Sequence, residues 1–203
     1  MIYQSSAWQE AADTDSLVRT YRNTGWNGYR LRNRQAIEAE IAAFPVKPSV
    51  LDAACFVGMY SEACSGADYL GVDVTQKFVD RASLLYPDKC FAVADIRRLP
   101  IVDGVFDIVF NFGTIIHMDE PAKVISELWR VAKHTLLLES TTHKSGPPAI
   151  DMRNPQPEFL HRSYNIDWLN GLICGLTNSM AIHSSVGTYG GFQSTLWTAR
   201  KRS

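Results

Sequence analysis

The sequence lacks the features that mark several classes of protein. No apolar run is long enough to span a bilayer, and the first residues, Met1-Ile2-Tyr3, have neither the basic nor the apolar stretch of a secretory signal. The charge is balanced, since 20 Lys and Arg residues face 21 Asp and Glu residues and leave a formal net charge of −1. This balance gives no electrostatic footprint for nucleic acid or an acidic membrane surface. We therefore expect a cytoplasmic protein with neither of these partners.

Cysteine is scarce and poorly spaced for metal or disulfide chemistry. The four cysteines, Cys55, Cys64, Cys90 and Cys174, form no C-x-x-C pair and no cluster with histidine. A zinc site needs ligands that converge at metal-bond distance, which this spacing does not favour. We expect no metal site, and we expect Cys55 and Cys90, in or beside apolar runs, to be buried thiols in a reducing compartment.

The pattern of apolar residues predicts one α/β domain. A chain of 203 residues suits one well-packed domain of this class and is short for two. From about Ser49 onward, short β-rich runs alternate with helical stretches, which is typical of parallel βαβ units. Strands are expected at residues 49–54, 68–73, 90–93, 106–111 and 134–139. Helices are expected at 17–21 and 31–44 before the sheet, at 58–64, after a Thr75 cap, after an Asp119 cap with Pro121 in the first turn, and at 166–176.

The rhythm changes after the fifth expected strand. Residues 140–163 contain one glycine and four prolines and are expected to hold no long regular element. Two closing runs, 180–186 and 192–199, flank a Gly-rich turn and predict an antiparallel hairpin at the sheet edge. The expected fold is thus α/β, with a Rossmann-like, doubly wound and mostly parallel sheet of about seven strands and a C-terminal antiparallel hairpin.

The expected strand ends carry polar residues where such a sheet binds ligands. In an open parallel sheet the site lies beyond the carboxyl ends of the strands, at the point where the strand order reverses. Asp73 ends the second strand and follows Asp52 by 21 positions, which is the spacing of an acid that accepts both hydroxyls of a ribose. Asp95, after the third strand, is placed to accept a hydrogen bond from an adenine amino group, and Asn111 ends the fourth.

Five motifs occur in a characteristic order. They are the turn Val50-Leu51-Asp52-Ala53-Ala54-Cys55-Phe56-Val57-Gly58, then Gly71-Val72-Asp73, Ala94-Asp95-Ile96-Arg97-Arg98-Leu99-Pro100, Phe106 to Met118, and Glu127-Leu128-Trp129-Arg130-Val131. Together they resemble the small type 11 branch of the class I S-adenosylmethionine (AdoMet)-dependent methyltransferases. The resemblance covers roughly residues 50–139 and implies AdoMet as cofactor and S-adenosylhomocysteine as product.

The resemblance also implies roles for individual residues. The cofactor-binding residues would be Trp26, Tyr29, Asp52, Ala53, Ala54, Cys55, Gly58, Asp73, Val74, Asp95, Ile96, Asn111 and Phe112. Within a single domain, residues 1–47 would form a helical cover, 48–140 the cofactor-binding core, and 141–203 a substrate-side segment with the terminal hairpin. His117 is the candidate general base, because histidine alone titrates unperturbed near neutral pH; the alternative is a histidine satisfied at a helix start.

The first turn departs from the family pattern at two positions, where Ala54 and Phe56 replace glycines. Alanine costs little if its φ is negative. The Phe56 ring is expected either over the methionine end of the pocket or packed away as core. These replacements leave open a second reading, a methyltransferase fold that lost catalysis and serves as a binding or scaffold module. A nicotinamide-dependent oxidoreductase would need a G-x-G-x-x-G turn, which residues 54–58 do not supply.

The expected reaction is in-line methyl transfer to a small-molecule acceptor. Residues 111–113, Asn-Phe-Gly, lack the Asn-Pro-Pro-aromatic signature of enzymes that methylate amino groups of nucleic acids or proteins. Polar side chains that could meet the acceptor follow the fifth strand: Arg153, His161, Arg162 and Tyr164. The sequence carries no signal for the acceptor's identity or for the oligomeric state.

Overall fold

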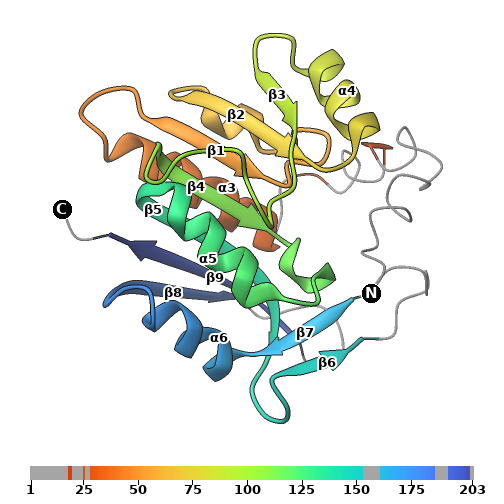
Figure 1. Cartoon of the computed structure of the whole chain (residues 1–203), viewed down its shortest axis with the longest axis vertical. Helices are drawn as coiled ribbons and strands as arrows, with labels where there is room; N and C mark the ends of the chain where they lie inside the picture. Colours follow the sequence, from red (N-terminus) through yellow and green to blue (C-terminus); the bar gives the residue numbers. More distant parts are fainter. Residues whose placement is uncertain (1–17, 20–24, 26–27, 153–160, 186–191, 202–203) are drawn as a thin grey trace.

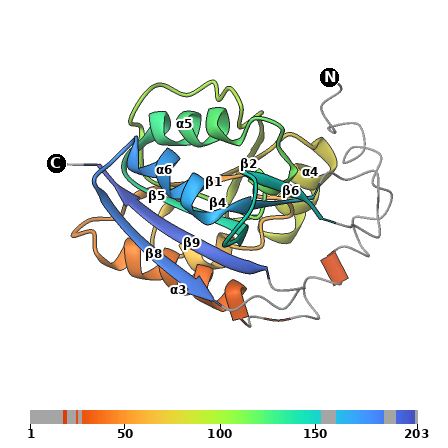
Figure 2. The same ribbon diagram turned by 90° about the horizontal axis from the view of Figure 1, so that it is seen from below.

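The computed structural model describes residues 18–19, 25, 28–152, 161–185 and 192–201. In this part of the chain a nine-stranded sheet is covered by helices on both faces (Figures 1 and 2). Helix α3 (Gly28–Ala42) and the short 3-10 helix η1 (Ser61–Cys64) lie on one face. Helices α5 (Pro121–Val131) and α6 (Ile166–Cys174) lie on the other. Within the described residues no helix has the length and apolarity needed to cross a membrane.

Five parallel strands form the half of the sheet that carries the expected site. They are β1 (Ser49–Ala53), β2 (Asp68–Asp73), β3 (Cys90–Val93), β4 (Phe106–Phe112) and β5 (Ala132–His143). Their order is β3-β2-β1-β4-β5, so the direction of winding reverses between β1 and β4. Helix α4 (Gln76–Leu85) connects β2 to β3. The carboxyl ends of all five strands therefore meet at one edge of the sheet, as the sequence predicts.

The C-terminal hairpin is also confirmed. Strand β8 (Ser179–Ser185) pairs antiparallel with β9 (Gln193–Arg200), and β9 pairs antiparallel with β5 over eight residues of each strand. Alternation along β5 sorts its side chains between the two faces. Leu136 and Leu138 pack with α5 and α6, and Leu137 packs with Ile37 of α3.

The stretch after Glu139 is more regular than expected. Strand β5 continues to His143, and two short strands follow, β6 (Ala149–Asp151) and β7 (Arg162–Asn165). Because β4 ends at Phe112, the last residues of β5 would lack a partner on that side, and β7 fills the place in parallel, opposite Thr142 and His143. His143 fixes the connecting turn through Ser163 Oγ (3.0 Å) and the carbonyl of Pro147 (2.9 Å).

Several smaller expectations need correction. Thr75 stands at the N-cap of α4, but its hydroxyl makes no capping bond. Glu120, not Asp119, is the N-cap residue of α5, and Asp119 pairs instead with Arg162. Only residues 61–64 of the expected 58–64 helix are helical, as a 3-10 turn. Cys90 is exposed, because β3 is the edge strand. Of the expected 17–21 helix only residues 18–19 are described, and both are helical.

The turn after β1 keeps a glycine-like backbone without its glycines. Ala54 has φ of 67°, Phe56 has φ of 53°, and the remaining glycine, Gly58, has φ of 76°. The condition under which alanine would cost little is therefore not met, since left-handed φ strains any residue with a Cβ by about 1–2 kcal/mol. The turn therefore stores strain at two non-glycine residues, Ala54 and Phe56.

This strain predicts that Ala54→Gly stabilises the fold. Relief of the left-handed conformation outweighs the greater flexibility of glycine in the unfolded chain, so the free energy of unfolding should rise by about 0.5–1 kcal/mol. Chemical denaturation measures this change. Ala53→Gly is the matched control: Ala53 is fully buried in β1, and its replacement should lower the free energy of unfolding by about 1 kcal/mol. Equal losses from both variants would contradict the strained turn.

Candidate cofactor-binding site

The carboxyl edge brings together the turn after β1 and the ends of β2 and β4. Asp73 joins the first two, because its carboxylate accepts the backbone N–H of Phe56 (2.9 Å) and of Thr75 (2.9 Å). The turn is also tied to β2 by the Cys55 N–H, which donates to Val72 O (2.8 Å). From the other side, Asn111 Nδ2 donates to the carbonyl oxygen of Ala53 (2.6 Å). Neighbouring strands thus hold the turn from both sides.

Asp73 retains capacity for a ligand. Its side chain is buried, with the residue only 7% exposed, and burial raises its pKa against the opposing effect of the Thr75 and Phe56 backbone bonds. A carboxylate has about four lone-pair sites, and each Asp73 oxygen accepts one of these two bonds. The remaining sites suit a pair of hydroxyl donors, as a ribose presents. Val74, the next residue, is half-buried beside it.

Two buried polar atoms at this edge have no partner. Within the described residues, Asn111 Oδ1 and Thr75 Oγ1 make no hydrogen bond, although both residues are almost fully buried. An unsatisfied buried polar atom costs about 1–3 kcal/mol. A ligand with donor groups would remove this cost, so the end of β4 and the start of α4 fit a polar cofactor.

Asp52 lies beneath the turn and not at its rim. In register it stands opposite Gly71 of β2 and Phe110 of β4, one residue before the end of β1. It is 4% exposed and accepts a hydrogen bond from the hydroxyl of Tyr69 (2.8 Å). Burial raises the pKa of Asp52 to about 8. Glycine is needed at position 71, since a Cβ there would lie 2.7 Å from that Tyr69 hydroxyl.

The Phe56 ring is partly buried and packs against a small core cluster, which favours the second of the two expectations for it. It lies edge-on against Phe78 of α4, with ring centroids 4.5 Å apart, in a small cluster that includes Val57. Cys55 is buried as expected, and burial raises its thiol pKa. Phe112, at the end of β4, packs against Tyr60, with centroids 5.0 Å apart.

Asp95 is held by its own turn. It accepts the backbone N–H of Arg97 (2.9 Å) and the Arg97 guanidinium in an ion pair. Burial acts to raise the pKa of Asp95, but the hydrogen bonds and charge of Arg97 outweigh it and hold the pKa below its usual value. Ile96 is buried, and the Asp95 carboxylate is half-buried. The predicted adenine contact would have to share this carboxylate with Arg97.

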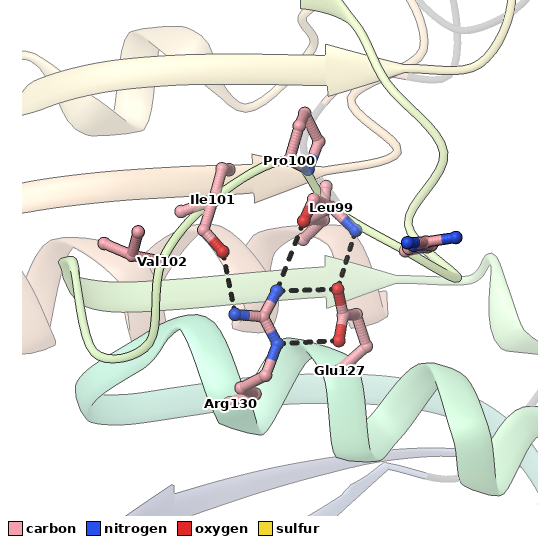
Figure 3. Close-up of a pocket in the computed structure, with 7 residues that line it drawn as sticks. Leu99, Pro100, Ile101, Val102, Glu127 and Arg130 are labelled. Atoms are coloured by element: carbon pink, nitrogen blue, oxygen red, sulfur yellow. Dashed lines mark hydrogen bonds and ion pairs between the residues drawn. The ribbon is translucent and has the colours of Figure 1, made fainter.

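Two of the sequence motifs prove to be one clamp (Figure 3). Glu127 of α5 accepts the N–H of Leu99 (2.6 Å), while Arg130 donates to the carbonyls of Leu99 (3.2 Å) and Ile101 (2.7 Å). Glu127 and Arg130 are joined to each other by two bonds of 2.8 Å, and Arg130 holds the pKa of Glu127 below its usual value. The turn that follows Asp95 is therefore fastened to α5.

The hollow around this clamp is not the expected cofactor site. It has a volume of about 620 Å³ and is open to solvent, and residues 98–102 line it together with Glu127 and Arg130. The backbone and carboxylate groups drawn in Figure 3 already bond one another. None of the residues predicted to bind the cofactor lines this hollow.

The clamp generates a prediction about local stability. Glu127→Gln removes the charge that pairs with Arg130, so the amide of Leu99 should exchange with solvent at least about tenfold faster, consistent with about 1.5 kcal/mol for a charged hydrogen bond. Hydrogen exchange measured by NMR checks this. Asp103→Asn is the control, because Asp103 is an exposed partner of the same Arg130 and its loss should change Leu99 exchange little. Equal exchange in both variants would contradict the clamp.

His117 lies at the end of the 3-10 helix η2 (Ile115–His117), beyond β4. Its ring is 5.4 Å, centroid to centroid, from that of His161, whose pKa is lowered by burial. Tyr164 steadies η2 by donating to the carbonyls of Ile115 (3.2 Å) and Met118 (2.9 Å). His161, Arg162 and Tyr164, which are expected near the acceptor, thus all contact η2 or the residue that follows it.

The remaining predicted residues are less informative. Tyr29 is exposed in the first turn of α3, and Trp26 and Arg153 lie outside the described residues. Within the described chain no group of three or more His, Cys, Asp or Glu side chains could hold a metal ion. A buried cluster under α3, containing Glu139 and Ser194, was missed. Its signal was an acid within the otherwise apolar run 136–139.

Sequence comparison identifies relatives of one kind. Residues 51–135 match the model of a family described as a methyltransferase domain, type 11. A probable S-adenosylmethionine-dependent methyltransferase of Mycobacterium tuberculosis is 27% identical over 187 residues, which cover 85% of this chain and 68% of the relative. The demethylmenaquinone methyltransferase of Renibacterium salmoninarum is 30% identical over 141 residues, covering 67% and 57% of the two chains. The ajmaline N-methyltransferase of Rauvolfia serpentina is 27% identical over 195 residues, covering 83% and 67%.

Solved structures share the fold. The magnesium protoporphyrin IX methyltransferase of Synechocystis with bound AdoMet superposes with a TM-score of 0.69 and 17% identity, covering 99% of each chain. The [4+2]-cyclase SpnF gives a TM-score of 0.72 with 16% identity, covering 84% of this chain and 80% of its own. At such identities the likeness speaks for the fold alone. Together with the sequence relatives, it shows that residues 51–135 are similar to the type 11 methyltransferase domain, and that the chain shares its fold with AdoMet-dependent methyltransferases.

Proposed function

We propose that this methyltransferase transfers its methyl group to a small-molecule acceptor by in-line displacement. The observation that carries the proposal is the polar carboxyl edge. There Asp73 and the unpaired Asn111 Oδ1 are hydrogen-bond acceptors that the donor groups of one ligand could fill. The formal net charge of −1 offers no field that would attract nucleic acid. The names of two relatives, an ajmaline and a demethylmenaquinone methyltransferase, refer to small-molecule acceptors.

Each residue at the carboxyl edge would bind a different part of the cofactor. Asp73 would accept the ribose hydroxyls, and Asp95 with Ile96 would flank the adenine beyond β3. Asn111 Oδ1 would accept a donor from the methionine end, while Ala53, Ala54, Cys55 and Gly58 contribute the backbone of the turn. Asp52 would act from below by holding Tyr69 and the end of β1 in place. Tyr29, Trp26, Val74 and Phe112 complete the proposed contacts.

When bound, AdoMet supplies a methyl group already activated by its sulfonium. The protein's own task is then to align the acceptor and to exclude water, which can contribute about 7–11 kcal/mol in well-oriented cases. His117, held by η2 beside His161, is the proposed general base for an acceptor that must lose a proton.

Calorimetric titration with AdoMet and S-adenosylhomocysteine tests the cofactor role of Asp73. Asp73→Asn should weaken binding of both ligands at least about tenfold, because it removes a charge-assisted acceptor for the ribose. Asp107→Asn is the matched control. Asp107 also accepts a backbone N–H, that of Ser49 at 2.8 Å, but at the amino end of β4.

The outcomes of this titration are distinct. Equal loss of affinity in the two variants, with both folded, would contradict the ribose role of Asp73. If the wild-type protein binds neither ligand at millimolar concentration, the proposal that it is an enzyme is overturned. The alternative, a scaffold with the methyltransferase fold, would then stand.

A second prediction concerns His117. With AdoMet labelled on its methyl group and a panel of small amines, phenols and carboxylic acids, wild-type protein should label at least one acceptor. His117→Gln should slow that transfer about 100-fold, the lower range for general base catalysis, and leave AdoMet affinity unchanged. His134→Gln, at the start of β5, should transfer at the wild-type rate. An unaltered rate in His117→Gln would show that the base lies elsewhere.

A further inference from the structure

Glu139 is a buried carboxylate that none of the roles above uses. It lies on β5 opposite Phe112 of β4, on the side of the sheet that α3 covers. Phe110, two residues earlier on β4, stands opposite Asp52 of β1. Glu139 is therefore level with the last residue of β4, at the same edge as the cofactor turn but on the far side of β4 from it.

The surroundings of Glu139 leave its charge only partly compensated. The residue is 4% exposed, and Ser194 Oγ of β9 donates to its Oε1 (2.6 Å). Arg32 of α3 acts through Ser194, since its guanidinium donates to Ser194 Oγ (2.8 Å) and to the Ser194 carbonyl (2.8 Å). Burial raises the pKa of Glu139, and the Ser194 bond, the Arg32 charge and a hydrogen bond from the Gly113 backbone oppose this rise only in part.

An unpaired donor lies in the same cluster. Gly113, at the end of β4, lies against the carboxylate, since a Cβ there would be in van der Waals contact with Glu139 Oε2 at 3.7 Å, and its φ of 70° accounts for the glycine. Asn33, fully buried on α3, accepts from Arg32 with its Oδ1, but its Nδ2 has no acceptor among the described residues. A buried charge and an orphaned amide that serve packing alone would be costly.

The strand order assigns a position to this cluster. If Asp95 and Asp73 take the adenine and ribose over β3 and β2, the rest of the cofactor runs across the switch point between β1 and β4. The next strand beyond its reactive end is β5. A group on β5 at the level of Phe112 then stands where an acceptor must approach.

We propose that the Glu139 carboxylate faces the point from which the methyl group is transferred and there binds an ammonium or hydroxyl group of the acceptor. Ser194 and Arg32 hold the carboxylate in place, and Asn33 offers its unpaired amide to an acceptor oxygen. The acceptor class is then a small molecule that carries an amine or a hydroxyl next to the atom methylated. This inference rests on the proposed function.

The experiment uses a ligand that places a cation at the transfer point. Sinefungin is an analogue of S-adenosylhomocysteine in which an amine-bearing carbon replaces the sulfur, so its ammonium lies where the methyl group would be. Wild-type protein should bind sinefungin at least about tenfold more tightly than S-adenosylhomocysteine, since a buried charged hydrogen bond contributes about 1.5 kcal/mol or more. Calorimetry at physiological ionic strength measures both affinities.

Variants locate the source of that preference. Glu139→Gln keeps the shape and an acceptor for Ser194, and it should bind the two ligands about equally, with the affinity for S-adenosylhomocysteine unchanged. Glu40→Gln is the matched control, because Glu40 likewise joins α3 to β5 and β9, through Thr135 (3.1 Å) and Arg200, but at the opposite end of β5. It should keep the wild-type preference.

Each alternative result has one meaning. A wild-type protein that binds S-adenosylhomocysteine but shows no preference for sinefungin overturns the inference while the proposed function stands. A preference that survives in Glu139→Gln also overturns it and leaves Glu139 a structural link like Glu40. If Glu139→Gln folds poorly, the inference can still be refuted, because the comparison of the two ligands on the wild-type protein needs no variant. Binding of neither ligand by the wild-type protein means that the proposed function itself has failed.

Discussion

The carboxylate of Asp73 is the constraint on which the cofactor edge depends. It fixes the turn after β1 and the start of α4 at once, by accepting the N–H groups of Phe56 and Thr75. Asn111 holds the same turn from β4. Because the turn is held from its two neighbouring strands, its left-handed residues need not be glycines, and the strain at Ala54 and Phe56 is offset by contacts outside the turn.

What the sequence predicted well is what local pattern controls. The first four parallel strands match their expected bounds within one residue, since each is an apolar run bounded by turn residues or a helix. The end of β5 was missed because residues 140–143 are polar and become a strand only through pairing with β7 and β9. The pairing with β7 is possible because β4 stops at Phe112, which is a property of the assembled sheet. The positive φ of Ala54 likewise occurs in a turn that β2 and β4 hold in place, and alanine itself does not predict it.

The site shows the same division between local and distant causes. The motifs 94–100 and 127–131 were recognisable one by one, but their connection through Glu127, Leu99 and Arg130 is a contact across about thirty positions of sequence. Conversely, the bond between Asp95 and Arg97 is local. It was not predicted, because the family pattern assigns Asp95 to a ligand and not to a neighbour two residues away. Glu139 was visible only as an acid in an apolar strand, and its partner Ser194 is 55 positions distant.

The energetic costs in this fold gather at one edge of the sheet. At the carboxyl edge stand two left-handed non-glycine residues, the unpaired Asn111 Oδ1 and the buried Glu139. At the amino edge the comparable carboxylate, Asp107, accepts from Ser49 and pairs with the exposed Lys133, and its pKa is held below the usual value despite some burial. Buried polar groups without partners and strained backbone persist where a ligand offsets their cost. The asymmetry between the edges therefore points to the carboxyl edge independently of any sequence motif.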